Sequence, residues 1–253
     1  MKEGIRERLR KGEVVFGVFC KTTDPNYIEI LGHSGFDFCI LDREHGTVSL
    51  ERLPDLIRAA ECSGMVPVVR TPDSRAESVS QPLDCGAGGV QVPQVGSAEE
   101  AREIIRAAKF APLGERGVCR FVRGAQFSAM DRADYFRKAN EALLILQLER
   151  KDIREYEAIA ELEAVDVLFI GPYDLSQAVG YPGQIEHPEV LAVMQRIVDA
   201  ARAKKKAVGV FADTPEQVAR WIAAGVQYIA YSVDVGIFTA ACRRTLAAIR
   251  PQS

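Results

Sequence analysis

The 253-residue sequence has no long apolar run, no closely paired cysteines, no basic excess and no glycine-rich phosphate turn. Its first residues, 1–6, are charged and carry no stretch typical of a signal peptide or membrane span, so we expect a cytoplasmic protein without membrane partners. Lysine and arginine are evenly spread and the net charge is -3, which argues against a basic face for nucleic acid or anionic lipid. The longest cationic run, Lys204-Lys205-Lys206, is interpreted as a solvated helix end.

The six cysteines lie far apart, and no two have the spacing of a zinc site or redox dithiol. They are Cys20, Cys39, Cys62, Cys85, Cys119 and Cys242. We expect them to be reduced thiols in the core. With 47% hydrophobic and 26% charged residues, the composition is that of a globular protein with one large core.

What the sequence does contain is a regular alternation of β-type runs and amphipathic helical stretches, with no linker between them. The predicted strands are Val14 to Cys20, Phe36 to Asp42, Val66 to Arg70, Gly89 to Pro93, Leu143 to Glu149, Val165 to Gly171, Ala207 to Ala212 and Tyr228 to Val233. The predicted helices include Leu50 to Cys62, Ala98 to Phe110, Asp152 to Leu162, Pro188 to Lys204 and Pro215 to Ala223. Eight strands joined by helices predict an α/β fold, a single (β/α)8 barrel domain over residues 1–253. The alternative, an open doubly wound sheet, usually carries the glycine-rich turn that is absent here.

Several predicted strands change from apolar to charged residues at their C-terminal ends. These ends are Leu41-Asp42-Arg43-Glu44-His45, Val68-Val69-Arg70, Leu146-Gln147-Leu148-Glu149 and Ile170-Gly171-Pro172-Tyr173-Asp174. In a parallel barrel these ends share the face on which active sites form. The sequence therefore predicts an enzyme.

Two carboxylates follow neighbouring predicted strands, Glu149 after the fifth and Asp174 after the sixth. They could converge on one cation, and two carboxylates completed by water and ligand oxygens suit a hard divalent ion such as Mg2+ or Mn2+. The alternative is that Glu149 forms an ion pair with a neighbouring lysine or arginine.

His45 is one of three histidines, and its place near a strand end suits a general acid or base; the alternative is a structural or exposed loop residue. Arg70 ends an apolar strand, where a guanidinium needs a carboxylate or an oxyanion. An ion pair with Glu44 or Glu149 would satisfy it. His33 and His187 are interpreted as turn or cap residues without a catalytic role.

Together these segments resemble the HpcH/HpaI family of class II, metal-dependent pyruvate aldolases over nearly the whole chain. The matching segments are Gly35-Phe36-Asp37, Leu41-Asp42-Arg43-Glu44-His45, Pro67-Val68-Val69-Arg70, Leu83-Asp84-Cys85-Gly86, Val92-Pro93-Gln94-Val95, Gly114-Glu115-Arg116-Gly117-Val118, Gln147-Leu148-Glu149, Phe169-Ile170-Gly171-Pro172-Tyr173-Asp174-Leu175-Ser176, Gly180-Tyr181-Pro182 and His187-Pro188-Glu189-Val190. Any one segment is unspecific, but the set is specific.

The resemblance implies an enzyme that cleaves a 4-hydroxy-2-oxo acid to pyruvate and an aldehyde, with oxaloacetate decarboxylation as a side activity. Glu149 and Asp174 would hold Mg2+ or Mn2+, with Co2+ a further candidate, and the ion would polarise the keto group. Arg70 would stabilise the pyruvate enolate. His45 would be the acid-base residue, oriented by Asp84 of a neighbouring subunit. From the sequence without the family, Asp84 is a helix-end residue.

The resemblance also implies residues that bind the substrate. Gln147 would support pyruvate or its metal, and Asp42 would lie near the acceptor end of the pocket or behind it. The backbone amides from Gly171 through Pro172 and Tyr173 to Asp174, opening toward Leu175 and Ser176, would bind the substrate carboxylate. The family further implies a homo-oligomer, a hexamer arranged as a trimer of dimers. The amphipathic stretch Val235 to Ile249 would pack on a neighbouring subunit, unless it packs on its own barrel.

The sequence departs from its sugar-acid and aromatic-catabolic relatives in the long connection Pro112 to Asn140, which has a predicted short helix near Arg132 to Ala139. Connections this long are usually functional or form interfaces. Arg120 and Arg123 within it suggest an acceptor aldehyde bearing a carboxylate or phosphate, or else subunit-interface ion pairs. Tyr231-Ser232-Val233-Asp234 replaces a more usual Val-Gly-Val-Asp, so the pocket wall should differ there too.

Two other functions remain open. One is a related enolate-forming lyase of the citrate-lyase or macrophomate-synthase type, which would show decarboxylation or bond formation with little aldol cleavage. The other is a non-catalytic sensor that binds a 2-oxo acid without turnover.

Overall fold

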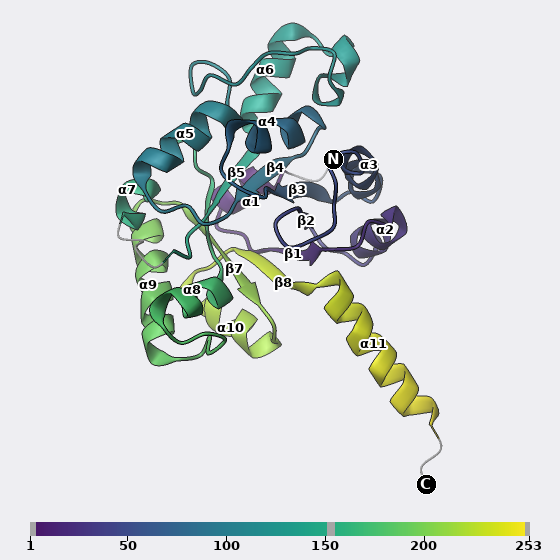
Figure 1. Cartoon of the computed structure of the whole chain (residues 1–253), viewed down its shortest axis with the longest axis vertical. Coiled ribbons are helices and arrows are strands. Elements are labelled where there is room, and N and C mark those ends of the chain that lie inside the picture. Colours follow the sequence, from purple (N-terminus) through teal and green to yellow (C-terminus); the bar gives the residue numbers. More distant parts are fainter. Residues whose placement is uncertain (1–3, 151–154, 251–253) are drawn as a thin grey trace.

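The chain forms a closed parallel barrel surrounded by helices, in a computed structural model that describes residues 4–150 and 155–250 (Figure 1). The strands are β1 Val15–Cys20, β2 Phe38–Asp42, β3 Val66–Arg70, β4 Gly89–Val92, β5 Leu143–Gln147, β6 Val167–Ile170, β7 Ala207–Ala212 and β8 Tyr228–Val233. They pair in chain order, and β8 closes the barrel against β1. This confirms the predicted (β/α)8 barrel. Each predicted strand lies within two residues of the observed bounds.

Helices connect the strands on the outside of the barrel. They are α1 Ile5–Arg10, α2 Pro25–His33, α3 Leu53–Cys62, α4 Ala76–Asp84, α5 Ala98–Ala108, the 3-10 helix η1 Arg123–Ser128, α6 Arg132–Glu141, α7 Tyr156–Ala160, α8 Pro172–Val179, α9 Pro188–Ala203, α10 Pro215–Ala224 and α11 Asp234–Ile249. The helix predicted over Asp152 to Leu162 is shorter, and residues 152–154 lie outside the described residues. His187 is the N-cap of α9, as the sequence predicted.

Aromatic side chains fill the barrel interior because glycines on the neighbouring strands leave room for them. The rings of Phe38 and Tyr228 stack with their centroids 3.9 Å apart. A Cβ at Gly17 would lie 2.2 Å from the Phe38 ring, so only glycine fits beside it. The dense interior is a packed core rather than a channel, and it leaves the strand ends to form the site.

The thiols and the lysine run differ in part from what the sequence predicted. Within the described residues all six cysteines are free, but Cys62, Cys119 and Cys242 are exposed, so their prediction as core thiols is wrong. Lys206 is not a solvated end either. Its ammonium donates to the carbonyls of Leu162 (2.7 Å) and Val165 (2.8 Å), which closes the turn before β6.

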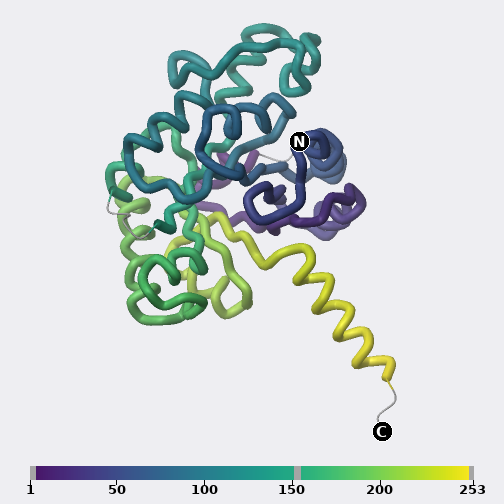
Figure 2. Tube along the Cα trace, viewed as in Figure 1, coloured from purple at the N-terminus to yellow at the C-terminus, as the bar shows by residue number. Residues whose placement is uncertain are grey.

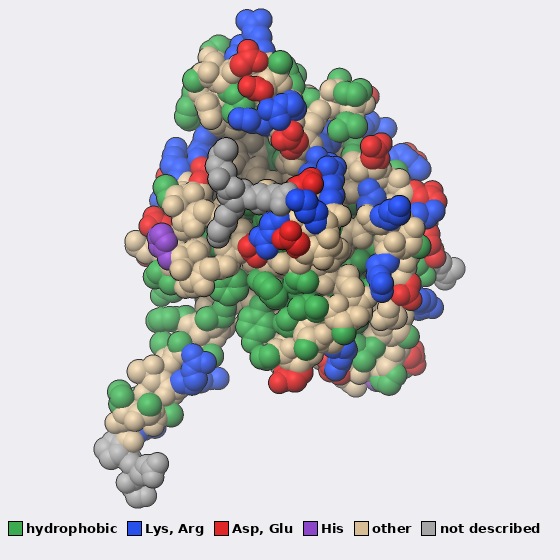
Figure 3. Space-filling view, turned by 180° about the vertical axis from the view of Figure 1, so that it is seen from behind, with side chains coloured by type: hydrophobic (Ala, Val, Ile, Leu, Met, Phe, Trp, Pro, Cys, Tyr) green, Lys and Arg blue, Asp and Glu red, His purple; other side chains and the backbone are tan. Residues whose placement is uncertain are grey.

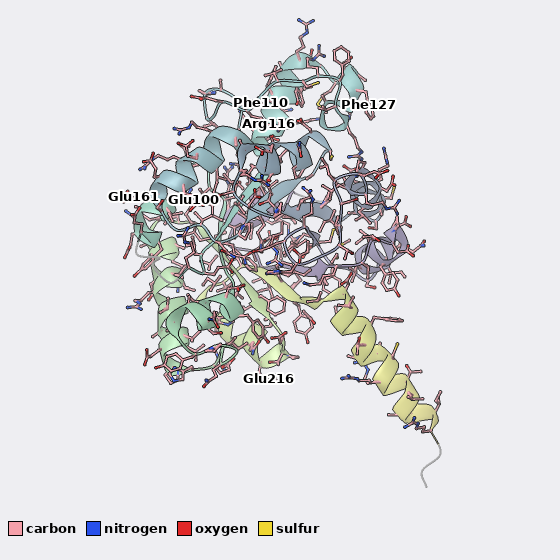
Figure 4. All side chains as sticks on the ribbon, viewed as in Figure 1. Glu100, Phe110, Arg116, Phe127, Glu161 and Glu216 are labelled. Carbon is pink, nitrogen blue, oxygen red and sulfur yellow. The ribbon has the colours of Figure 1, made fainter. Side chains whose placement is uncertain are left out.

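The long connection between β4 and β5 leaves the barrel at its N-terminal end, because α5 has already carried the chain back from the strand tips. Figure 4 shows Phe110 and Arg116 there, with the guanidinium 4.8 Å from the ring centre. Arg123 pairs with Glu61 at the end of α3, and Arg120 donates to carbonyls of its own loop, 3.1 Å from the oxygen of Met130. Within one chain these two arginines therefore do not lie at the strand tips, so a role in acceptor binding would have to be at the site of another subunit.

Helix α11 leaves the barrel and projects away from it (Figure 2). Its first turns touch the body of the protein, where the rings of Tyr27 and Phe238 pack edge to face, 5.8 Å apart. Further along, Leu246 and Ile249 are exposed. In the view from behind, hydrophobic side chains continue from the barrel surface onto this helix (Figure 3). Among the helices described, none is long and apolar enough to span a membrane.

Candidate active site

A cavity of about 180 Å3 opens at the C-terminal ends of the strands, where the sequence predicted the site. Its polar lining is Lys21, His45, Arg70, Gln147 and Asp174, and its apolar lining includes Phe19, Phe169, Phe211 and Val233. A larger cavity, about 630 Å3, lies at the opposite end between α1, α4 and α6 and is lined by none of the predicted site residues. We assign the site to the smaller cavity, because acid, base and cation converge there.

One side of this cavity is acidic. Glu149 follows β5 and is almost fully buried; its carboxylate accepts hydrogen bonds from Nε2 of Gln147 (2.6 Å) and the amide of Gln94 (3.2 Å). Burial, together with the carboxylates of Asp174 and Glu44, raises the pKa of Glu149 to about 7. Gly171 makes this arrangement possible, since a Cβ there would lie 2.0 Å from Oε2 of Glu149.

These carboxylates fit a divalent cation. The hydrogen bonds that the described residues make to Glu149 come from amides rather than from a cation. The neighbouring carboxylate Asp174 lies in the first turn of α8 and lines the same cavity. Glu149 is buried and Asp174 is exposed, and the charge of Asp174 helps to raise the pKa of Glu149, so a cation between them would relieve this repulsion. Among the described residues no group of three or more histidine, cysteine or acidic side chains could hold a metal. A pair of carboxylates leaves coordination positions open for substrate and water.

Arg70, the last residue of β3, lines the same cavity as Asp174 and is held firmly. Its Nε and Nη2 donate to the two oxygens of Asp42 at 2.9 and 2.7 Å, and Nη1 lies 2.9 Å from Glu44. Its guanidinium also lies 4.8 Å from the ring centre of Phe19. The predicted ion pair with Glu44 is thus present, and the pair with Glu149 is not among the contacts described. Asp42 is fully buried behind Arg70 and does not line the cavity.

Sequence reasoning considered Glu44 merely as a partner for arginine, but the structure places it within the acidic cluster. Burial raises the pKa of Glu44, although Arg70 opposes that shift. Its Oε1 lies 3.4 Å from Nε2 of Gln94 and 3.9 Å from Nε2 of His45. The signal was present in the sequence, because Glu44 lies two residues beyond the strand-terminal Asp42.

His45 lies on the rim of the cavity, with 54% of its side chain exposed. Its backbone is fixed: the amide donates to Asp42 (3.1 Å), and the carbonyl accepts from the ammonium of Lys21 (3.0 Å). The ring is left in contact with both solvent and cavity. An imidazole so placed can take a proton from a bound hydroxyl and release it to water.

The start of α8 contributes backbone rather than side chains. Gly171 caps the helix and Pro172 is its first residue, so the amides of Tyr173 and Asp174 lie in the first turn, where helices leave N–H groups unpaired. Tyr173 lines the cavity, and its hydroxyl donates to Asp213 at 2.5 Å.

The side chains of the next two residues of α8 make contacts within the fold and do not face the cavity. The side chain of Leu175 is buried in the core between strands and helices, and its amide donates to the carbonyl of Gly171 at 3.0 Å. The hydroxyl of Ser176 donates to the carbonyl of Tyr173 and accepts from the amide of Gly183. Neither side chain lines the cavity.

Asp84 is a predicted site residue that lies at the other end of the barrel from this cavity. It ends α4 at the N-terminal end of the barrel and pairs with Arg116 at 2.5 Å. A role for Asp84 at an active site therefore requires the site of another copy of the chain.

Two residues that sequence reasoning missed organise the side of the mouth opposite Glu149. Lys21 directly follows β1 and lines the cavity. The buried Asp234, at the start of α11, accepts from the amides of Lys21 (3.1 Å) and Thr22 (2.9 Å) and so fixes this turn. The signal for Asp234 was the strand-end acid in Tyr231-Ser232-Val233-Asp234, which had been considered only as a wall of the pocket.

Comparison with known proteins agrees with this geometry. The sequence profile of the HpcH/HpaI aldolase/citrate lyase family matches residues 15–241. The 2-keto-3-deoxy-L-rhamnonate aldolase of Salmonella paratyphi B is 35% identical over 245 residues, covering 96% of this chain and 91% of that protein. An HpcH/HpaI aldolase/citrate lyase family protein from Burkholderia cenocepacia superposes with a TM-score of 0.92 at 31% identity, covering 98% and 99% of the two chains. The citrate synthase SbnG superposes with a TM-score of 0.87 at 30% identity, covering 97% and 96%.

Proposed function

The chain belongs to the HpcH/HpaI aldolase/citrate lyase family, and from that premise we propose that it is a metal-dependent aldolase, an aldehyde-lyase acting on 4-hydroxy-2-oxo acids. It would cleave such an acid reversibly into pyruvate and an aldehyde. The observation that carries the proposal is one small cavity lined by Arg70 and Asp174, with the buried carboxylate of Glu149 close enough to Asp174 for the two charges to interact.

Glu149 and Asp174 would hold Mg2+, Mn2+ or Co2+, and the bound cation would act as a Lewis acid on the keto oxygen of the substrate. Gln147 orients Glu149 through its 2.6 Å hydrogen bond, and its oxygen accepts from Nε2 of Gln91 at 2.7 Å, so the second N–H of its amide would be the group offered to the substrate. The amides of Tyr173 and Asp174 bind the substrate carboxylate at the start of α8.

Arg70 stabilises the negative charge that develops on the keto oxygen when the substrate becomes an enolate. Asp42 and Glu44 hold the guanidinium in place before the reaction, so little reorganisation is needed when the charge forms. Since that charge is fully developed only after the bond breaks, Arg70 acts on turnover more than on substrate affinity.

His45 moves the proton. In the cleavage direction it takes the proton from the hydroxyl on carbon four, directly or through a water, and the bond between carbons three and four breaks. The electron pair of that bond passes to the keto group as pyruvate enolate, and the aldehyde leaves. Protonation of carbon three then completes pyruvate. Asp84 of a neighbouring subunit would orient the imidazole of His45.

The assembly this requires is a homo-oligomer, which we propose to be a cytoplasmic hexamer built as a trimer of dimers. Two features support subunit contacts: Asp84 lies away from its own site, and Phe238, Leu246 and Ile249 on the projecting α11 are exposed. Helix α11 would be exchanged between subunits and cover apolar surface there.

A related enolate-forming lyase is the second candidate, favoured by the likeness to the citrate synthase SbnG over nearly the whole chain. It would use the same acids and Arg70 on another carbon electrophile. A sensor that binds a 2-oxo acid without turnover is disfavoured, because acid, base and cation are all present at the cavity.

The test is pyruvate release from a panel of 4-hydroxy-2-oxo acids, coupled to lactate dehydrogenase, after EDTA treatment and after addition of Mg2+ or Mn2+. Metal-dependent release supports the aldolase and ranks its acceptors. If no 4-hydroxy-2-oxo acid in the panel releases pyruvate while oxaloacetate is decarboxylated, the result supports the second candidate. Tight oxalate binding without any turnover would support the sensor.

A further inference from the structure

The acceptor side of the cavity has an apolar wall and one ammonium group at its rim. Phe19 and Phe211 contact each other edge to face, with ring centres 5.8 Å apart, and Val233 continues the same wall. Lys21 lies at the end of β1, whereas Glu149 follows β5, and in a closed eight-stranded barrel these two strands are diametrically opposed. A substrate held at Glu149 and Asp174 by its 2-oxo acid half therefore extends toward Lys21 with its other half.

Lys21 is poised to bind an anion. Its ammonium carries three N–H donors, and the contacts described for it are the carbonyl of His45 at 3.0 Å and an oxygen of Asp42 at 3.3 Å. That Asp42 carboxylate is already held by two donors of Arg70. The Lys21 side chain is 32% exposed and lines the cavity, so a donor and its charge face the space that the acceptor half would occupy.

The position of Lys21 is fixed before any ligand arrives. Asp234 holds the backbone of this turn with amide bonds to Lys21 and Thr22 and a 2.6 Å bond from the Thr22 hydroxyl. Arg70, the second cation lining the cavity, is occupied by two carboxylates. Arg120 and Arg123 of the same chain are bound away from this cavity, so within one chain the acceptor-side cation is Lys21.

We propose that Lys21 determines acceptor specificity by binding a carboxylate on the far half of the substrate, so that the enzyme prefers 4-hydroxy-2-oxo dicarboxylic acids. This inference rests on the proposed function, since it assumes that the 2-oxo acid half binds at Glu149 and Asp174. The cavity volume of about 180 Å3 restricts the acceptor to a few carbons, because sites for larger molecules usually measure about 300–1,000 Å3. A sugar-derived aldehyde without charge, as in the substrate named for the Salmonella relative, would leave Lys21 unused.

Ligand binding tests the inference without requiring turnover. The probes are 2-oxoglutarate and 2-oxopentanoate, five-carbon 2-oxo acids that differ only in the terminal carboxylate, titrated by calorimetry into the Mg2+-loaded protein. We expect wild type to bind the diacid at least tenfold more tightly, Lys21→Met to lose that preference, and Lys21→Arg to keep most of it. The matched control is Lys204→Met at the far end of α9, where Lys204 pairs with Glu161; it should keep the full preference.

A preference below twofold in wild type, or one that survives in Lys21→Met, would overturn the inference. An equal loss of affinity for both ligands in Lys21→Met would also overturn it, because that result is expected if Lys21 only holds His45 and Asp42 in place. Aldol synthesis from pyruvate with glyoxylate against glycolaldehyde gives the second readout, and the ratio of kcat/KM should fall about tenfold in Lys21→Met. If the binding preference follows Lys21 while no pyruvate chemistry occurs with any acceptor, the proposed function fails and the anion site stands.

Discussion

Gly171→Ala offers a sharp test of the metal site, because it adds one carbon and no charge. The new Cβ would lie 2.0 Å from Oε2 of Glu149 and 3.0 Å from Nε2 of Gln147, and ordinary contact begins near 3.4 Å. The carboxylate must therefore retreat by about 1.4 Å, whereas metal–ligand distances tolerate about 0.2 Å. Displacing one ligand should weaken metal affinity about 10- to 100-fold, which corresponds to about 1.4–2.7 kcal/mol.

The assay is calorimetric titration of Mn2+ into EDTA-stripped protein, with thermal unfolding recorded to show that the variant folds. The matched control is Gly4→Ala, at the start of α1 on the other end of the barrel, where an added Cβ would meet nothing within 4 Å. It should bind metal as wild type does. A dissociation constant for Gly171→Ala within twofold of wild type would refute the assignment of Glu149 as a ligand.

Four further changes test other parts of the account. Arg70→Ala should abolish both aldol cleavage and oxaloacetate decarboxylation, with kcat falling far more than KM changes; steady-state kinetics with unaltered kcat would contradict its role. His45→Ala should lower aldol cleavage by about 10²- to 10⁴-fold and decarboxylation far less, because only cleavage needs proton transfer at the hydroxyl; equal losses would count against that division. Glu149→Gln should weaken metal binding, and an unchanged Mn2+ titration would exclude it as a ligand. Burial lowers the pKa of Lys109 from 10.5 to about 8, so between those pH values the unfolded chain holds the extra proton and stability rises with pH, by up to about 3 kcal/mol. In urea unfolding from pH 7.5 to 10, the stability of wild type relative to Lys109→Met should therefore increase with pH, and parallel profiles would contradict it.

The barrel could be predicted from the sequence because its strands are short apolar runs of uniform character. Ala207–Ala212 and Tyr228–Val233 match their predictions to the residue. Helices were harder where local signals conflict. Helix α4 contains Pro82 in its interior, and α8 starts directly after β6, so in both places a helix stands where the sequence carries a signal against one or leaves no connecting loop.

The sequence alone could indicate which residues have the chemical groups for the site, but not which of them contact one another. Strand-end position identified Glu149, Asp174, Arg70 and His45, since all parallel strands end on one face. That Asp42 binds Arg70 in two places depends on the register between β2 and β3, in which these two residues lie side by side. A single sequence contains no information on that pairing.

Topology explains why Arg120 and Arg123 do not reach the cavity of their own chain. A connection that follows a helix returns to the N-terminal end of the barrel, whereas one that follows a strand lies at the active-site end. Lys21 follows β1 directly and so reaches the mouth, although in the sequence it is an isolated lysine beside Thr22 and Thr23.

The central claim is that the acids at β5 and β6 bind a metal and, with Arg70, generate pyruvate enolate. Its most direct test is exchange of the methyl hydrogens of pyruvate for deuterium in D2O, followed by proton NMR in EDTA-treated enzyme before and after Mn2+ is added. In EDTA we predict that the enzyme exchanges hydrogen no faster than a solution without enzyme. Once Mn2+ is added, exchange should become rapid in wild type and stay slow in Glu149→Gln. Equal exchange with and without metal, or rescue of Glu149→Gln to the rate of wild type, would contradict the account.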